Sequence, residues 1–145
     1  MATLLLACAR YWAGDVAENH RAGHRAYDAV NRGDLDGFLA LMDDDVEAVS
    51  FLVAMEGAYP GHAGIRRWWH HLFDVSPDYA VEVVEVRDSG DQTLATLHNR
   101  GQGSSSGTPF EASLWMLGRW RRGKCFWWQA FGDKDEALEA AGLRE

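Results

Sequence analysis

Apolar and polar residues alternate with a helical period in two stretches near the start of the chain. Over residues 16–31 the apolar positions fall on one side of a helix. Gly33 predicts the end of this helix, because glycine readily takes the left-handed conformation that follows many helices. Asp34 is expected to cap a second helix that runs to Met42, so the two helices should meet at a tight corner.

The pattern then predicts a short strand and a third helix. The acidic run at residues 43–45 is expected to close the second helix, and the β-branched residues of 46–51 favour a first strand. A turn at residues 59–62 leads into an amphipathic stretch over 63–74. Ser-Pro-Asp at 76–78 should end that third helix, because the residue before a proline disfavours helical conformation.

Beyond Pro77 the hydrophobic period changes to two, which is typical of half-buried strands. Adjacent strands with short turns form an antiparallel meander, and Asp133 is expected to cap a final short helix over 133–141. Three helices followed by a long, curved antiparallel sheet predict a two-layer α+β domain. The four strands of the meander are expected at residues 79–87, 93–101, 109–120 and 124–131.

Length and charge narrow the classes of protein that fit. The 145 residues suit one domain over 1–145, with 1–14 as an extension or a frayed terminus. The net charge of −8 would repel phosphate backbones, so nucleic acid is not an expected partner. No stretch approaches the ~18 apolar residues of a membrane span. We therefore expect no membrane partner and a cytoplasmic location.

Aromatic residues are abundant, with seven Trp and six Phe. Aromatic side chains fill cores, but they also line ligand pockets and interfaces, and the sequence leaves these alternatives open. On the last predicted strand they point to both faces of the sheet, whereas the helices can cover one face only. A homodimer through the outer face of the sheet is therefore expected.

No spacing of ligand residues predicts a metal or a cofactor. Cys8 and Cys125 lie far apart and match no metal or redox motif, so both are expected to be free thiols. The acidic run at 43–45 lacks the interleaved glycine and the later glutamate of a calcium loop. His20 and His24 share a helix face, but a solvated polar face is the preferred interpretation.

Several short motifs stand in a fixed order along the chain: N-R-G-D-L-D at 31–36, Y-P-G-H-A-G-I at 59–65, S-G at 106–107, R-G-K at 122–124 and E-A-L-E-A-A-G-L at 136–143. Together they resemble the SnoaL-like, nuclear transport factor 2-like superfamily, and the similarity covers about residues 16–143. The resemblance implies a conical sheet around the helices, a cavity inside the cone for a small molecule, and usually a dimer.

The same resemblance implies several activities, from ketosteroid isomerases and polyketide cyclases to non-catalytic binding modules. Isomerase chemistry of this kind needs a carboxylate base and an acidic hydrogen-bond donor. The corresponding positions here hold Ser50 and Trp115, and a lone serine hydroxyl cannot abstract a carbon-bound proton near neutral pH. The isomerase mechanism is therefore disfavoured. An acid–base cyclase or dehydratase, a ligand binder and an accessory dimerisation module stay open.

His98 and Glu111 are the candidate acid–base pair. His98 lies within a predicted strand between apolar neighbours, and Glu111 begins the next strand. If the two meet across the hairpin, the carboxylate would orient the imidazole and raise its basicity; the alternative is that both are ordinary surface residues. The expected ligand is a small apolar or aromatic molecule. Its expected contacts are Ser50, Phe51, Tyr59, Trp69, Phe73, Ser113, Trp115 and Trp128.

Overall fold

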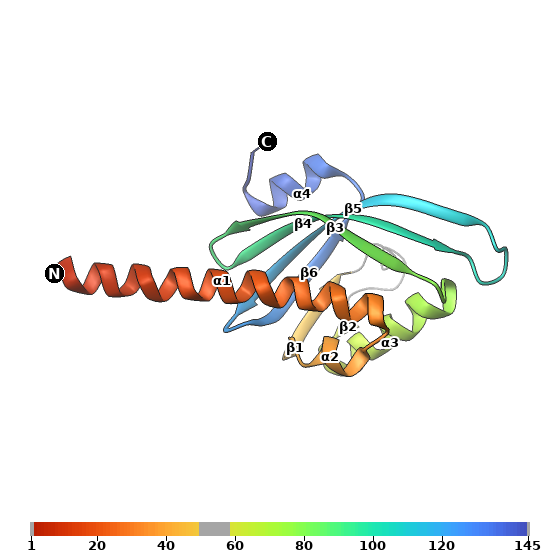
Figure 1. Cartoon of the computed structure of the whole chain (residues 1–145), viewed down its shortest axis with the longest axis horizontal. Helices are drawn as coiled ribbons and strands as arrows, with labels where there is room; N and C mark the ends of the chain where they lie inside the picture. Colours follow the sequence, from red (N-terminus) through yellow and green to blue (C-terminus); the bar gives the residue numbers. More distant parts are fainter. Residues whose placement is uncertain (1, 50–58, 145) are drawn as a thin grey trace.

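The computed structural model describes residues 2–49 and 59–144, with side chains from Ala17 onward. Within these residues, four helices and six strands form one α+β unit (Figure 1). The helices are α1 (Ala2–Arg32), α2 (Leu35–Leu39), α3 (Gly61–Val75) and α4 (Lys134–Ala141). The strands are β1 (Met42–Val49), β2 (Tyr59–Pro60), β3 (Ala80–Ser89), β4 (Gln92–Gln102), β5 (Pro109–Arg121) and β6 (Lys124–Phe131).

The six strands form one curved sheet in the order β2-β1-β6-β5-β4-β3. Helices α1, α2 and α3 lie on one side of this sheet, and α4 lies on the other (Figure 1). The predicted meander is confirmed, because β3 to β6 pair antiparallel in chain order. One pairing departs from the all-antiparallel expectation, since β1 runs parallel to β6. Strand β6 follows β1 only after β2, α3 and strands β3 to β5. No local sequence pattern therefore predicts that β1 and β6 run parallel.

The predicted second helix is too long. It is capped by Asp34, whose Oδ1 accepts a hydrogen bond from the Gly37 backbone at 2.9 Å, but it ends at Leu39. Met42, expected to be its last residue, instead begins β1 and pairs with Cys125 of β6. The sheet therefore overrides the helical period, because pairing with β6 satisfies backbone groups that a longer helix would have used.

Two other boundaries differ from the expectation. Helix α1 begins at Ala2, so residues before 16 continue the predicted first helix, and this part of α1 extends past the sheet in Figure 1. The predicted turn at 59–62 contains the short edge strand β2, in which Tyr59 pairs with Ala48. None of the helices in the described residues is long and apolar enough to cross a membrane.

Alternation along the strands divides the buried residues between two cores. The larger core packs the inner face of the sheet against α1, α2 and α3, and includes Ile65 and Leu97. The smaller core packs Leu94 and Leu117 of the outer face against Leu138 of α4. Because successive side chains of a strand point to opposite faces, Leu94 and Leu97 identify which β4 residues face inward.

Helix α1 is fixed to the sheet by side chains that bond backbone groups of the strands. The Asn31 amide donates to the Val81 carbonyl at 2.7 Å, and its Oδ1 accepts from the Val81 N–H at 2.8 Å. Near the middle of the helix, the Asn19 Oδ1 accepts from the Gly123 N–H in the β5–β6 turn at 3.0 Å. These bonds place the inner side of α1 over the concave face of the sheet.

Candidate functional site

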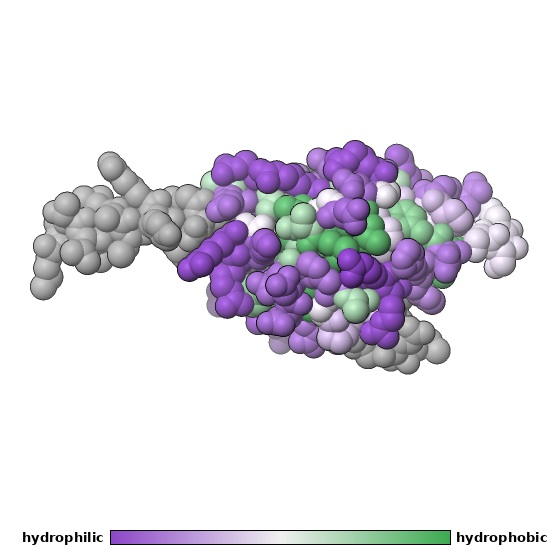
Figure 2. Space-filling view, turned by 90° about the horizontal axis from the view of Figure 1, so that it is seen from below, coloured by the Kyte–Doolittle hydropathy of each residue, from purple (hydrophilic) through white to green (hydrophobic). Residues whose placement is uncertain are grey.

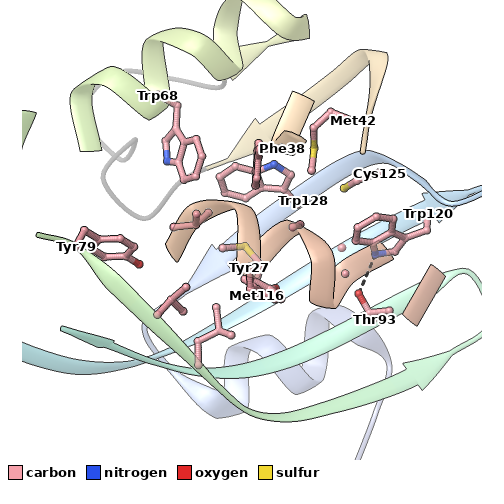
Figure 3. A pocket seen from close by; sticks show the side chains of 16 residues that line it. Tyr27, Phe38, Met42, Trp68, Tyr79, Thr93, Met116, Trp120, Cys125 and Trp128 are labelled. Atoms are coloured by element: carbon pink, nitrogen blue, oxygen red, sulfur yellow. Dashed lines mark hydrogen bonds between the residues drawn. The ribbon is translucent and has the colours of Figure 1, made fainter. Parts of the chain in front are cut away.

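A cavity of about 60 Å³ lies between α1 and the concave face of the sheet. Its wall combines α1, through Ala26 and Tyr27, with Trp68 of α3 and with Leu97 and Trp128 of the sheet (Figure 3). The helix supplies small residues here, and Ala26 is only 5% exposed. The hollow exists because small side chains on α1 do not fill the space that the curved sheet encloses.

A second, larger cavity of about 450 Å³ adjoins the first. The two share Trp68, Tyr79, Met116 and Trp128 as wall residues. The larger cavity extends to an apolar rim, where Val75 is 45% and Phe110 is 37% exposed. In Figure 2, apolar side chains are visible in the middle of the face seen from below, bordered by hydrophilic ones. The four shared wall residues place the two cavities next to each other, and the larger one includes these exposed apolar residues.

The described wall of both cavities carries no charged side chain. Its groups that could ionise are Tyr27, Tyr79 and Cys125. Burial raises the pKa of the Tyr79 phenol to about 12. Burial likewise raises the pKa of the Cys125 thiol to about 12, against hydrogen bonds that lower it. The pKa of Tyr27 is raised by burial first and by Cys125 and Tyr79 second. All three groups are therefore neutral at pH 7.

The polar groups of the wall differ in how they are satisfied. The Tyr79 hydroxyl donates to the Asn99 Oδ1 at 2.7 Å. The Trp120 indole N–H donates to the Thr93 hydroxyl at 2.8 Å, the dashed line in Figure 3. The Trp128 indole N–H is buried and has no hydrogen-bond partner.

Aromatic rings build one side of the site. The Trp68 and Trp128 rings pack edge to face, with centroids 5.0 Å apart at 69°. Phe38 of α2 lies 5.6 Å from Trp68 and 5.4 Å from Trp69, again between ring centroids. Such tilted contacts hold rings in fixed positions. Figure 3 shows Trp68, Phe38 and Trp128 grouped together, apart from Trp120 and Thr93.

The residues predicted to contact a ligand lie in different places. Trp128 lines both cavities, and Ser113 lines the larger one. Trp69 and Phe73 pack against each other, with ring centroids 5.1 Å apart, and are absent from the described walls. Tyr59 is also buried outside these walls, with the Arg67 guanidinium 5.7 Å from its ring centroid. Ser50 and Phe51 lie outside the described residues.

His98 and Glu111 do meet, but on the outer face of the sheet. The His98 Nε2 lies 3.7 Å from the Glu111 Oε2, and its Nδ1 lies 3.9 Å from the Glu82 Oε2. The neighbours of His98 on β4, Leu97 and Asn99, line the cavities, so His98 points away from them. The pair therefore lies outside the two cavities, and its catalytic role stays a prediction that this geometry does not favour.

Trp115 also belongs to the outer face. It packs with the smaller core beneath α4, and its buried indole N–H has no partner. Helix α4 covers the part of this face around Leu94 and Leu117. The homodimer through the outer face stays a prediction, with less of the sheet available than the sequence suggested.

Replacing His98 with alanine is expected to leave ligand binding in the cone unchanged within about twofold. The imidazole is separated from the cavities by the sheet, so its removal takes away no contact with a molecule inside. Calorimetric titration of a cavity ligand into both proteins measures this. A tenfold loss of affinity with unchanged thermal unfolding would place His98 in the site after all.

Wall residues missed in the sequence include Tyr27, Trp68 and Met116. The helical period does place Tyr27 on the core side of α1, and this was the available signal. Trp68 and Trp69 are adjacent on α3, and only the packing of that helix decides which one reaches the cavity.

No cluster of three or more His, Cys, Asp or Glu in the described part of the chain is placed to hold a metal ion. The His20 Nδ1 lies 2.9 Å from the Asp88 Oδ2, and the His20 and His24 ring centroids lie 4.8 Å apart with the rings tilted by 53°. This arrangement joins α1 to β3 on the surface. The acidic run at 43–45 lies within β1.

Comparison with known proteins places this geometry in context. The model of the SnoaL-like domain matches residues 24–128, more than half of the chain. No curated protein matches the chain. Among solved structures, TerC co-crystallised with polyporic acid is 24% identical, with a TM-score of 0.72 over 84% of this chain and 96% of TerC.

Two further structures share the fold. One is an NTF2-like protein of unknown function from Burkholderia pseudomallei, 19% identical, with a TM-score of 0.73 over 84% of this chain and 95% of the other. The second is a SnoaL-like polyketide cyclase, so named without proof of activity, from Jannaschia; it is 17% identical, with a TM-score of 0.73 over 90% of this chain and 96% of the other. At these identities the likeness shows the fold alone.

Proposed function

Because this chain belongs to the SnoaL-like domain family, whose fold encloses a cavity here, we propose that it binds a small, neutral, largely apolar molecule inside the cone. One observation carries the proposal: the described walls of both cavities are aromatic and aliphatic and hold no charge. A charged molecule would lose its hydration on entry and gain no opposite charge from these walls. A neutral aromatic molecule would exchange water for ring contacts.

Ligand binding fits the described walls better than acid–base catalysis does. Proton transfer near neutral pH needs a group that titrates in that range. The described wall offers phenols and a thiol with raised pKa values, each of which holds its proton at pH 7. The Jannaschia neighbour is named a polyketide cyclase, but the candidate His98–Glu111 pair lies on the other face of the sheet. We therefore propose binding as the primary function.

The dimensions of the site support a ligand of two or three fused rings. The outer cavity of about 450 Å³ lies within the range of small-molecule sites. The inner cavity of about 60 Å³ would take only one end of such a molecule. TerC, which has the same fold, was co-crystallised with a small molecule, polyporic acid.

The test uses three fluorene compounds that differ in charge: neutral fluorenone, anionic fluorene carboxylate and cationic fluorenyl ammonium. Equilibrium dialysis against the full chain at pH 7 measures each affinity. Fluorenone is expected to bind at least about tenfold more tightly than either ion, because the ions pay a desolvation cost without pairing. Equal or tighter binding of an ion, or no binding of fluorenone, would contradict the proposal.

A further inference from the structure

One wall residue, Trp128, combines deep burial with an unused hydrogen-bond donor. Its side chain is 4% exposed, and its Nε1 has no hydrogen-bond partner. It lines both cavities, and its ring packs against Trp68. It comes from β6, opposite Gly118 of β5; a Cβ on Gly118 would lie 2.8 Å from the Trp120 Nε1, so the glycine makes room there for the Trp120 indole.

An unpaired buried donor is costly, about 1–3 kcal/mol, so buried N–H groups nearly always have partners. Contact with an aromatic ring does not replace such a bond, because interactions of N–H with π-systems are second-order. The Trp120 indole shows the usual arrangement in the same cavity, with its N–H on the Thr93 hydroxyl. The Trp128 indole N–H, in contrast, has no such acceptor.

The described wall offers no acceptor that Trp128 uses. The Asn99 Oδ1 already accepts from Tyr79, and the Thr93 hydroxyl from Trp120. A second unpaired indole, that of Trp115, packs in the smaller core under α4 and does not line either cavity. Of these two unpaired indoles, Trp128 is the one whose side chain lines the cavities.

We propose that the ligand is a carbonyl compound whose oxygen accepts a hydrogen bond from the Trp128 Nε1–H, while its apolar rings contact Trp68 and Met116. This inference rests on the proposed function and narrows it from neutral apolar molecules in general to ketones, esters or quinones. Indole nitrogen only donates, so it selects an acceptor and gives nothing to a hydrocarbon of the same shape. Trp128 is a binding residue that sets specificity.

The test compares fluorenone with fluorene, which has nearly the same shape but no acceptor. The full chain is expected to bind fluorenone about 5–10-fold more tightly, the effect of one hydrogen bond. In Trp128→Phe the two compounds should bind with about equal affinity, because the ring stays aromatic and the donor is lost. Trp127→Phe is the matched control, since Trp127 is next on the same strand and packs on the outer face; it should keep the preference.

A spectroscopic readout on the unaltered protein covers the case in which Trp128→Phe does not fold. In a proton–nitrogen correlation spectrum, the Trp128 indole proton should move downfield with fluorenone and not with fluorene. Assignment of that signal follows from selective labelling and sequential connectivity. Ring contacts move nearby indole signals with either compound, so the expected pattern is a difference between the fluorenone and fluorene shifts that is confined to this indole among the seven of the chain.

The outcomes separate this inference from the proposed function. Equal binding of fluorene and fluorenone, with no shift of the Trp128 signal, would overturn the inference and leave the binding function standing. A preference that disappears in Tyr27→Phe but survives in Trp128→Phe would also overturn it, since the phenol would then be the donor. Failure of both compounds to bind would contradict the proposed function and the inference together.

Discussion

Replacing Ala26 with leucine is expected to weaken fluorenone binding by about 50-fold. Ala26 faces the inner cavity from α1, and the added carbons would occupy the volume of about 60 Å³ that one end of the ligand needs. Excluding about three buried methylene equivalents costs about 0.8 kcal/mol for each, and 1.4 kcal/mol corresponds to tenfold. Because the new side chain fills a hollow, the melting temperature should hold within about 3 °C. Equilibrium dialysis and thermal unfolding measure the two quantities separately.

The matched control is Ala140→Leu. Ala140 is exposed on α4, on the opposite side of the sheet, so the same substitution there should leave affinity unchanged. If Ala26→Leu bound fluorenone as tightly as the unaltered chain, the inner cavity would not be part of the binding site.

Replacing Gly64 with alanine is expected to destabilise the fold by about 2 kcal/mol, lowering the melting temperature by about 4–8 °C. A Cβ at this buried position of α3 would lie 2.6 Å from the Tyr59 carbonyl carbon and 3.1 Å from the Tyr59 Cα. Backbone cannot rotate away as a flexible side chain can, so the junction of β2 and α3 must shift. This cost exceeds the gain of up to about 1 kcal/mol that alanine brings to a helix.

Gly23→Ala provides the comparison with the opposite sign. Gly23 also lies within a helix, α1, but its Cβ would meet nothing closer than the Trp120 Cζ2 at 3.6 Å, an ordinary contact. The substitution should raise the unfolding free energy by about 0.5–1 kcal/mol. Urea denaturation of both variants checks the pair. A destabilised Gly23→Ala or a neutral Gly64→Ala would show that helix–sheet spacing differs from the one described.

The meander was predictable from sequence because its information is local. Period-two alternation and hairpin turns fix where β3 to β6 lie and how they pair. The partner of β1 was not predictable in this way. Met42 could continue a helix or begin a strand, and its pairing with Cys125, more than 80 positions away in the sequence, decided the outcome.

The sequence predicted the kind of side chains that line the candidate site, but not which residues supply them. An aromatic-lined cavity with Trp128 in its wall is found, whereas His98 lies on the wrong face for it. Strand alternation shows that Leu97 and His98 point opposite ways, but not which of the two faces inward. That choice depends on where the helices pack. Here α1 and α3 cover the Leu97 side, and α4 covers the other.

The Asn31 side chain has a consequence beyond fixing α1 to the sheet. By bonding both the N–H and the carbonyl of Val81, it imitates one residue of an additional strand at the open side of β3. The opposite margin of the sheet ends in β2, which is only two residues long. Unprotected margins invite strands of other molecules and lead to aggregation. The protein therefore limits self-association at both margins of the sheet. At one margin the Asn31 amide occupies backbone groups of β3, and at the other margin the edge strand β2 is short.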